Sequence, residues 1–167
     1  MDESPELTSQ DLTHLRRCVG LAREALDDGD EPFGSVLVDP EGVVLHEDRN
    51  RTAAGDQTRH PEFELARWAA ENVAAEVRAA CTVYKSGEHC PMCSAAHAWV
   101  GLGRIVYAGS TAQLVEWRTS WGLPAGPVAA LPINDVAPGL PIAGPAHELA
   151  DELRELHKQR AERDAAS

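Results

Sequence analysis

The chain has 167 residues, which corresponds to one domain, and its 27 acidic residues outnumber 15 lysines and arginines to give a net charge of −12. Its hydrophobic content of 43% is typical of a globular protein with a sizeable core. Without a basic stripe or tail, this charge argues against a nucleic-acid partner, because nucleic acids are bound largely by basic side chains on phosphates. A small, roughly neutral ligand fits the charge better.

No apolar stretch approaches the roughly 20 residues of a membrane span. The N-terminal segment MDESPELTSQ is acidic and has neither the basic nor the apolar region of a secretory signal. Four cysteines are too few for a disulfide scaffold. We therefore expect a cytoplasmic protein without a membrane partner, in which a C-x-x-C motif serves metal binding or redox chemistry.

The predicted elements alternate between helices and strands. Apolar residues at helical spacing predict a first amphipathic helix, and the segment PEG joins two β-rich runs into a hairpin. In chain order, we predict a helix over 9–28, strands over 33–39 and 42–47, a helix over 61–76, a strand over 81–86, a helix over 91–103 and a strand over 104–109. Strands separated by helices around a mixed sheet predict an α/β fold, a three-layer α/β/α sandwich.

The pattern weakens beyond residue 111. A proline- and glycine-rich segment follows, and a polar helix is predicted over 146–164. We therefore expect one domain over 1–167, with a core over 10–110 and a C-terminal segment over 111–167 that covers the site as a lid.

Two of the cysteines stand three residues apart in HCPMC. Proline is favoured at the first position of a helix, so Pro91 makes Cys90 the N-cap and puts Cys93 in the first turn. A helix N-terminus favours negative charge and therefore the thiolate form of both side chains. Together they form half of a zinc site.

The segment HPE repeats this arrangement 30 residues earlier. Residues two apart on a regular helix point in nearly opposite directions. Proline pushes the residue before it out of the helical region, so His60 becomes an extended cap while Glu62 enters the first turn after Pro61. Both segments thus present a ligand at the start of a helix.

Three protein ligands and an open position are typical of a catalytic zinc site. His60, Cys90 and Cys93 supply the ligands, and zinc would convert its bound water into a hydroxide nucleophile. Glu62 is then the acid/base group that accepts the water proton and returns it to a ring nitrogen and to the departing amine. The chemistry indicated is hydrolytic deamination of an amino-substituted aromatic ring.

The segments EPFGSVLVD, RNR, HPE and HCPMCSAAHAWVGLGRIVYA, in this order, resemble the cytidine deaminase-like superfamily, in its guanine deaminase and tRNA adenosine deaminase branch. The resemblance covers residues 10–110. It implies a Zn²⁺ cofactor, a homodimer, a base contact by Asn50 and an aromatic wall by Trp99. Phe33, at the start of a strand, is either a core residue or a further substrate contact.

Two departures from the family pattern bear on the substrate. Pro61 stands where most relatives have alanine, so no backbone N–H is available there, and His89 stands where most have proline. Glu116 is the only acidic residue in 109–123, where guanine deaminases carry an acidic residue that reads the base. With these departures the chain resembles actinobacterial-type nucleobase deaminases, which implies free bases or analogues such as isoguanine, cytosine, 5-azacytosine and triazines as substrates.

Other interpretations remain open. The substrate is alternatively guanine, or a nucleoside or nucleotide such as cytidine or dCMP, whose phosphate Arg49, Arg51 and Arg59 would hold. The cysteines alternatively belong to a thioredoxin-like dithiol or to a closed structural zinc site, with His97 and either His89 or His60. The protein would in that last case be a zinc-stabilised binding module without turnover.

Overall fold

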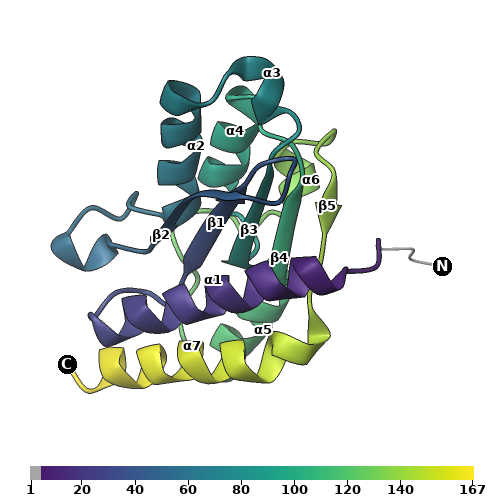
Figure 1. Cartoon of the computed structure of the whole chain (residues 1–167). Helices are drawn as coiled ribbons and strands as arrows, with labels where there is room; N and C mark the ends of the chain where they lie inside the picture. Colours follow the sequence, from purple (N-terminus) through teal and green to yellow (C-terminus); the bar gives the residue numbers. More distant parts are fainter. Residues whose placement is uncertain (1–4) are drawn as a thin grey trace.

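A mixed sheet of five strands forms the centre of the computed structural model, which describes residues 5–167 (Figure 1). Residues 1–4, the start of the acidic N-terminal segment, lie outside the described residues. In spatial order the strands are β2 (Val44–Arg49), β1 (Gly34–Val38), β3 (Thr82–Gly87), β4 (Ile105–Gly109) and β5 (Ile142–Ala143). β1 runs antiparallel to β2 and β3, whereas β3, β4 and β5 are parallel.

Helices cover both faces of this sheet, which confirms the predicted three layers. α1 (Ser9–Asp27) packs on β1 and β3, with α7 (Ala150–Ala165) beside it (Figure 1). On the other face, α2 (Pro61–Asn72) packs on β1 and β2 and against α4 (Pro91–Trp99). The shorter helical elements are η1 (Thr52–Ala54), α3 (Ala75–Arg78), α5 (Thr111–Ser120), α6 (Ile133–Val136) and η2 (His147–Leu149).

The two faces are built by alternation along the strands. In β1, Val36 and Val38 join the core cluster under α1, while Leu37 between them joins the cluster under α2. In β3, Tyr84 packs on the α1 side and Val83 on the α2 side. Lys85 shares a face with Val83 by the same period and therefore lies toward α2.

The predicted helix over 61–76 is two helices in the structure. α2 ends at Asn72, and the next residue, Val73, has the extended angles φ −121° and ψ 128°. Val73 packs against the core cluster under α2, so the chain leaves the helical path there to bury an apolar side chain. α5, α6 and β5 lie in the region where the sequence pattern is weak.

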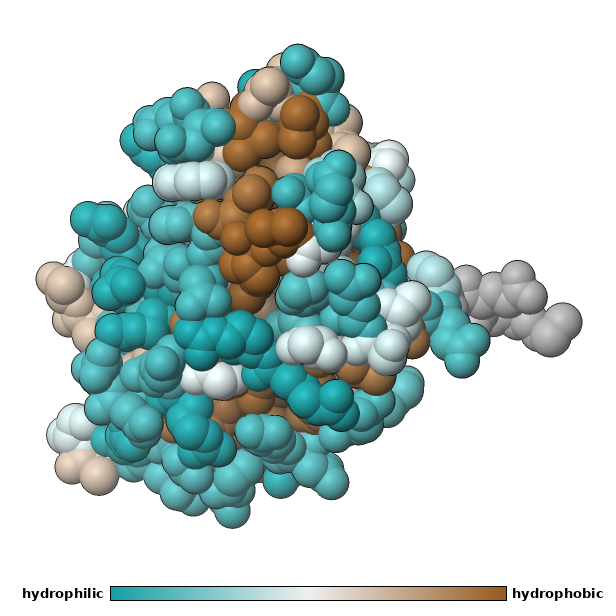
Figure 2. Space-filling view, in the orientation of Figure 1, coloured by the Kyte–Doolittle hydropathy of each residue, from teal (hydrophilic) through white to brown (hydrophobic). Residues whose placement is uncertain are grey.

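The site is positioned by the parallel pair β3 and β4. Their carboxyl ends lie at one edge of the sheet, where α4 follows β3 and α5 follows β4. Such an edge is where ligands bind in open α/β sheets. Figure 2 shows a mostly hydrophilic face with a hydrophobic strip across it. No helix within residues 5–167 is long and apolar enough to cross a membrane.

Candidate active site

The starts of α2 and α4 carry the predicted metal ligands. His60 is the N-cap of α2 with φ −85° and ψ 139°, and Cys90 is the N-cap of α4 with φ −69° and ψ 168°. Both caps are extended because a proline follows each of them at the first helical position. α2 and α4 pack side by side, which brings the two caps together.

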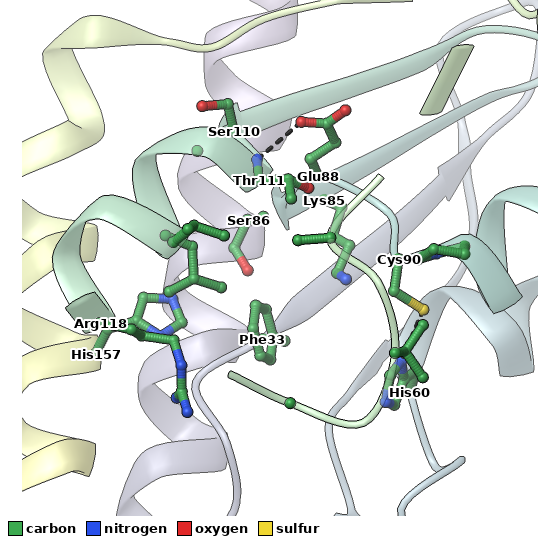
Figure 3. A pocket seen from close by; sticks show the side chains of 18 of the residues that line it. Phe33, His60, Lys85, Ser86, Glu88, Cys90, Ser110, Thr111, Arg118 and His157 are labelled. Atoms are coloured by element: carbon green, nitrogen blue, oxygen red, sulfur yellow. Dashed lines mark hydrogen bonds between the residues drawn. The ribbon is translucent and has the colours of Figure 1, made fainter. Parts of the chain in front are cut away.

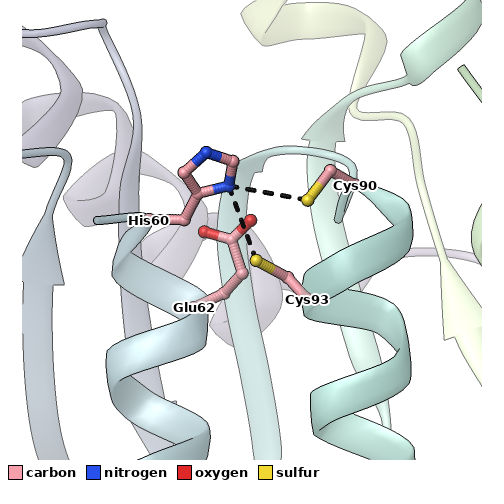
Figure 4. A group of neighbouring side chains, drawn as sticks. All are labelled: His60, Glu62, Cys90 and Cys93. Atoms are coloured by element: carbon pink, nitrogen blue, oxygen red, sulfur yellow. Dashed lines mark hydrogen bonds between the residues drawn. The ribbon is translucent and has the colours of Figure 1, made fainter. Parts of the chain in front are cut away.

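His60, Glu62, Cys90 and Cys93 converge on one point (Figure 4). The Nδ1 atom of His60 lies 3.5 Å from the sulfur of Cys90 and 3.5 Å from that of Cys93. One candidate ligand atom from each of the four residues lies within 4.8 Å of the others. Two thiols and one imidazole are a donor set that fits zinc, with the carboxylate beside them as a fourth group.

Electrostatics at this centre favour a thiolate. A hydrogen bond from Cys93 lowers the pKa of Cys90 to about 4, against the raising effect of burial, and a hydrogen bond from His60 adds to the decrease. The position of Cys90 at a helix N-terminus acts in the same direction. Burial and the hydrogen bond with Cys90 raise the pKa of Cys93, so the pair holds one thiolate and one thiol at neutral pH.

The closed structural site is not formed, because His97 and His89 lie outside the group. His97 Nε2 hydrogen-bonds to the carbonyl of Gly103 at 2.7 Å and so fixes the end of α4. His89 is fully buried and packs edge-on against His97, with ring centroids 5.5 Å apart. Neither ring nitrogen of His89 has a partner within residues 5–167, and burial lowers its pKa well below the usual value, so the ring is neutral.

Glu62 is buried, with 1% exposure, and forms an ion pair with Lys85, which is 3% exposed. Burial is the largest single effect and raises the pKa of Glu62, but the charge of Lys85, the neighbouring His89 and His60, and the hydrogen bond from Lys85 together lower it to about 2. The carboxylate is therefore ionised. Its Oε1 atom contacts Lys85, whereas Oε2 has no hydrogen-bond partner among the described residues.

A cavity of about 240 Å³ opens beside the centre. His60 and Cys90 line one end, Phe33 lies in the middle, and Arg118 and His157 lie at the other end (Figure 3). Burial lowers the pKa of His157 to about 3, so its ring is neutral. The cavity therefore joins a metal end to a far end that carries one cation and one neutral imidazole.

Asn50 and Phe33, the two other residues predicted to contact the substrate, both line this cavity. The Asn50 carbonyl oxygen accepts bonds from the Thr52 N–H at 3.0 Å and the Thr52 hydroxyl at 2.8 Å, which leaves the amide NH₂ for a ligand. The Asn50 N–H donates to the Phe33 carbonyl at 3.0 Å. A Cβ atom at Gly87 would lie 3.0 Å from the Phe33 ring, so a side chain there would crowd the ring.

The prediction for Trp99 is wrong for this cavity. Trp99 is 88% exposed at the last residue of α4 and does not line the cavity. It lies six residues after Cys93, which is about 9 Å further along the helix and about 240° around it. Glu116 is also absent from the cavity wall, where Arg118 is found instead.

The sequence analysis missed the roles of Lys85 and Glu88. A lysine inside the apolar strand CTVYKS is a signal that could have identified Lys85, because lysine is almost never fully buried without a partner. The Glu88 carboxylate accepts the N–H of Thr111 at 2.8 Å and that of Ile133 at 2.9 Å. These are the first residues of α5 and α6, so Glu88 joins α5, which lines the cavity, to the helix that follows the lining segment 128–131.

The three arginines considered for a nucleotide phosphate are paired with carboxylates. The pairs are Arg49 with Asp28 and Asp30, Arg51 with Asp48, and Arg59 with Asp56 and Glu64. None of the three lines the cavity. This arrangement weakens the nucleotide interpretation.

A Cys₂His group with an adjacent carboxylate, at the edge of a mixed α/β sheet, defines a zinc centre of the catalytic type. The chain belongs to the cytidine and deoxycytidylate deaminase family, whose zinc-binding region matches residues 8–109. It is therefore an enzyme, a hydrolase of C–N bonds with zinc as its cofactor.

Named relatives agree with this family. A probable cytosine deaminase of Schizosaccharomyces pombe is 34% identical over 116 residues, which are 68% of this chain and 68% of the relative. The guanine deaminase of Bacillus subtilis is 33% identical over 105 residues, 62% of this chain and 67% of that protein. The structure of a guanine deaminase from Nitrosomonas europaea has a TM-score of 0.69 and 19% identity, covers 96% of this chain and 89% of its own, and shows the shared fold.

Proposed function

We propose that the protein deaminates free nucleobases or base analogues and releases ammonia. The observation that carries the proposal is the cavity of about 240 Å³ beside the Cys₂His group and Glu62. Pockets for drug-sized ligands measure about 300–1,000 Å³, so this volume favours one ring system without a sugar. The net charge of −12 also favours a small substrate over tRNA.

His60, Cys90 and Cys93 would hold the zinc ion, which when bound activates water for attack on the amino-bearing ring carbon. The Asn50 amide donates a hydrogen bond to the base, and the Phe33 ring packs against it. Glu62 accepts one water proton at Oε2 and passes it to the ring nitrogen; it then carries the second proton, from the hydroxyl on the attacked carbon, to the amine, which leaves as ammonia.

The cavity wall supports isoguanine, cytosine, 5-azacytosine or a triazine over guanine. Pro61 lines the cavity and cannot donate an N–H. Arg118, at the far end of the cavity, forms no ion pair within residues 5–167 and offers donors to a carbonyl or ring nitrogen. The 2-amino group of guanine is itself a donor and needs an acceptor such as a carboxylate, whereas Arg118 offers only donors.

The C-terminal segment supports the cavity rather than lying apart from it. Val128 and Leu131 line the cavity from the proline- and glycine-rich segment, and Leu153 and His157 line it from α7. We propose that this segment excludes water from the bound base. Truncation after residue 140 should abolish turnover while zinc stays bound, and a fully active truncated protein would exclude the lid.

Ammonia release should be measured over a panel of cytosine, 5-azacytosine, isoguanine, guanine, ammeline, adenine, cytidine and adenosine. Glu62→Gln should lower kcat by about 10²-fold or more, since general acid–base groups contribute about 10²–10⁴-fold. Its zinc content should not change, because the three other residues hold the metal. Glu64→Gln, in the same first turn but outside the cavity lining, is the matched control.

A zinc-stabilised binding module gives the opposite result. In that case the wild-type protein releases no ammonia from any base, and the substitution of Glu62 does not change the affinity for a binding partner. Inactivity of the wild-type, zinc-loaded protein on the whole panel would therefore exclude the proposed substrate class.

A further inference from the structure

We infer that Lys85 is a positioning residue of the reaction, which holds the Glu62 carboxylate by one oxygen and thereby keeps the other oxygen directed at the reacting atoms. The inference rests on the proposed deaminase function. It concerns a residue of β3 that is neither in the metal-ligand group nor in the motifs that mark the family.

The contacts of the carboxylate are asymmetric. Lys85 Nζ contacts Oε1 of Glu62, and the two side chains are 4% and 0% exposed. Oε2 is buried and has no hydrogen-bond partner among the residues that the structure describes. A proton carrier needs one oxygen free for exchange, and the observed contact leaves that oxygen free.

The ammonium group is itself held firmly. Lys85 lies in the register of β3 opposite Ser35 of β1 and Tyr107 of β4, so neighbouring strands fix its backbone on both sides. Its Nζ lies 4.7 Å from the centroid of the Phe33 ring, a cation–π distance. The side chain is thus fixed between the ring that lines the cavity and the carboxylate of Glu62.

Lys85 also lines the cavity together with Asn50, His60 and Cys90. Packing alone does not call for a lysine here, because a buried ion pair is often no more stabilising than well-packed apolar residues. Lys85 thus lies between the cavity and the Glu62 carboxylate, which belongs to the metal-ligand group. The pair therefore has the location that proton transfer to a ring nitrogen requires.

The main test compares Lys85→Met with the wild-type zinc-loaded protein, because methionine keeps the length of the stem and removes the charge. The expected kcat is lower by about 100-fold, within the range for a lost acid–base contribution, with KM changed less than threefold and zinc content unchanged. Crystals of the variant should show Glu62 turned away from its wild-type orientation. An unchanged Glu62 orientation or a kcat within threefold of wild type would overturn the inference.

Lys85→Ala separates charge from packing and also serves if Lys85→Met fails to fold. The truncation removes the equivalent of propylamine, so added propylammonium should restore at least 10-fold in kcat in a saturable manner. The neutral 1-propanol, of the same size, is the matched control and should restore nothing. Equal rescue by propanol, or no rescue by propylammonium, would show that Lys85 only fills space. Because both assays need an active wild-type enzyme, failure of the proposed function is recognised before either variant is interpreted.

Discussion

The attachment of the cavity wall through Glu88 gives a prediction that needs no substrate. Its carboxylate accepts the N–H groups of Thr111 and Ile133, at 2.8 Å and 2.9 Å, and therefore caps α5 and α6 together. Glu88→Gln keeps the size of the side chain but replaces one acceptor by an NH₂ group. That group faces a backbone N–H, so one of the two bonds is lost and one donor is left without a partner.

A hydrogen bond to a charged group contributes about 1.5–3 kcal/mol. We therefore expect Glu88→Gln to lower the free energy of opening of the cavity wall by about 2 kcal/mol. Each 1.4 kcal/mol corresponds to a factor of ten, so amide hydrogen exchange at Thr111 or Ile133 should accelerate about 10- to 100-fold. The wall is a local unit, so Glu88→Gln should change the free energy of global unfolding in urea less than it changes the free energy of local opening.

Glu76→Gln is the matched control, because Glu76 is an exposed residue in the first turn of the short helix α3. It should leave exchange at both amides unchanged. Equal exchange rates in Glu88→Gln and wild type, at both Thr111 and Ile133, would refute the conclusion that one carboxylate joins the two helices.

Two further predictions concern acid stability and the exposed tryptophan. Burial would raise the pKa of Asp11, but hydrogen bonds from Arg104, from the Thr8 N–H and from Tyr84 lower it to about 2, below its ordinary 3.8. This difference contributes about 2 kcal/mol to the free energy of unfolding above pH 4, and the contribution is lost as the pH falls toward 2. Urea unfolding of Asp11→Asn should therefore depend less on pH in this range than that of the wild type. Trp99 is exposed, so Trp99→Ser should leave KM within twofold of wild type and the free energy of unfolding within about 0.5 kcal/mol. A large rise in KM would instead support the sequence-based prediction that Trp99 contacts the substrate.

The metal-ligand group could be predicted from sequence because it is encoded locally. In HPE and CPMC, the proline fixes both the extended cap and the first turn, so the direction of His60 and Cys90 hardly depends on the rest of the chain. The approach of the two caps depends only on adjacent packing of α2 and α4. The layers were predictable for a similar reason, since β-rich apolar runs alternate with helical patterns along the chain.

The cavity wall could not be predicted in the same way. Arg118 and His157 reach it from α5 and α7, about 40 residues apart in sequence, and only tertiary packing brings them together. Trp99 was assigned by its spacing from Cys93, but helical rotation turns that position away from the cavity. Lys85 is recognisable in the sequence as a charged residue within an apolar strand. Its role could not be predicted, because only the structure shows that its partner is Glu62.

The order of the elements separates reactivity from choice of substrate. The candidate metal ligands and Glu62 sit on two helix starts that the sheet supports directly, while much of the far end of the cavity comes from the loops and helices after β4. Changes between residues 110 and 131 can therefore alter which ring is accepted without disturbing the groups that cleave the C–N bond. A designer who wants a new specificity from this scaffold should diversify that stretch and leave His60-Pro61 and Cys90-Pro91 intact.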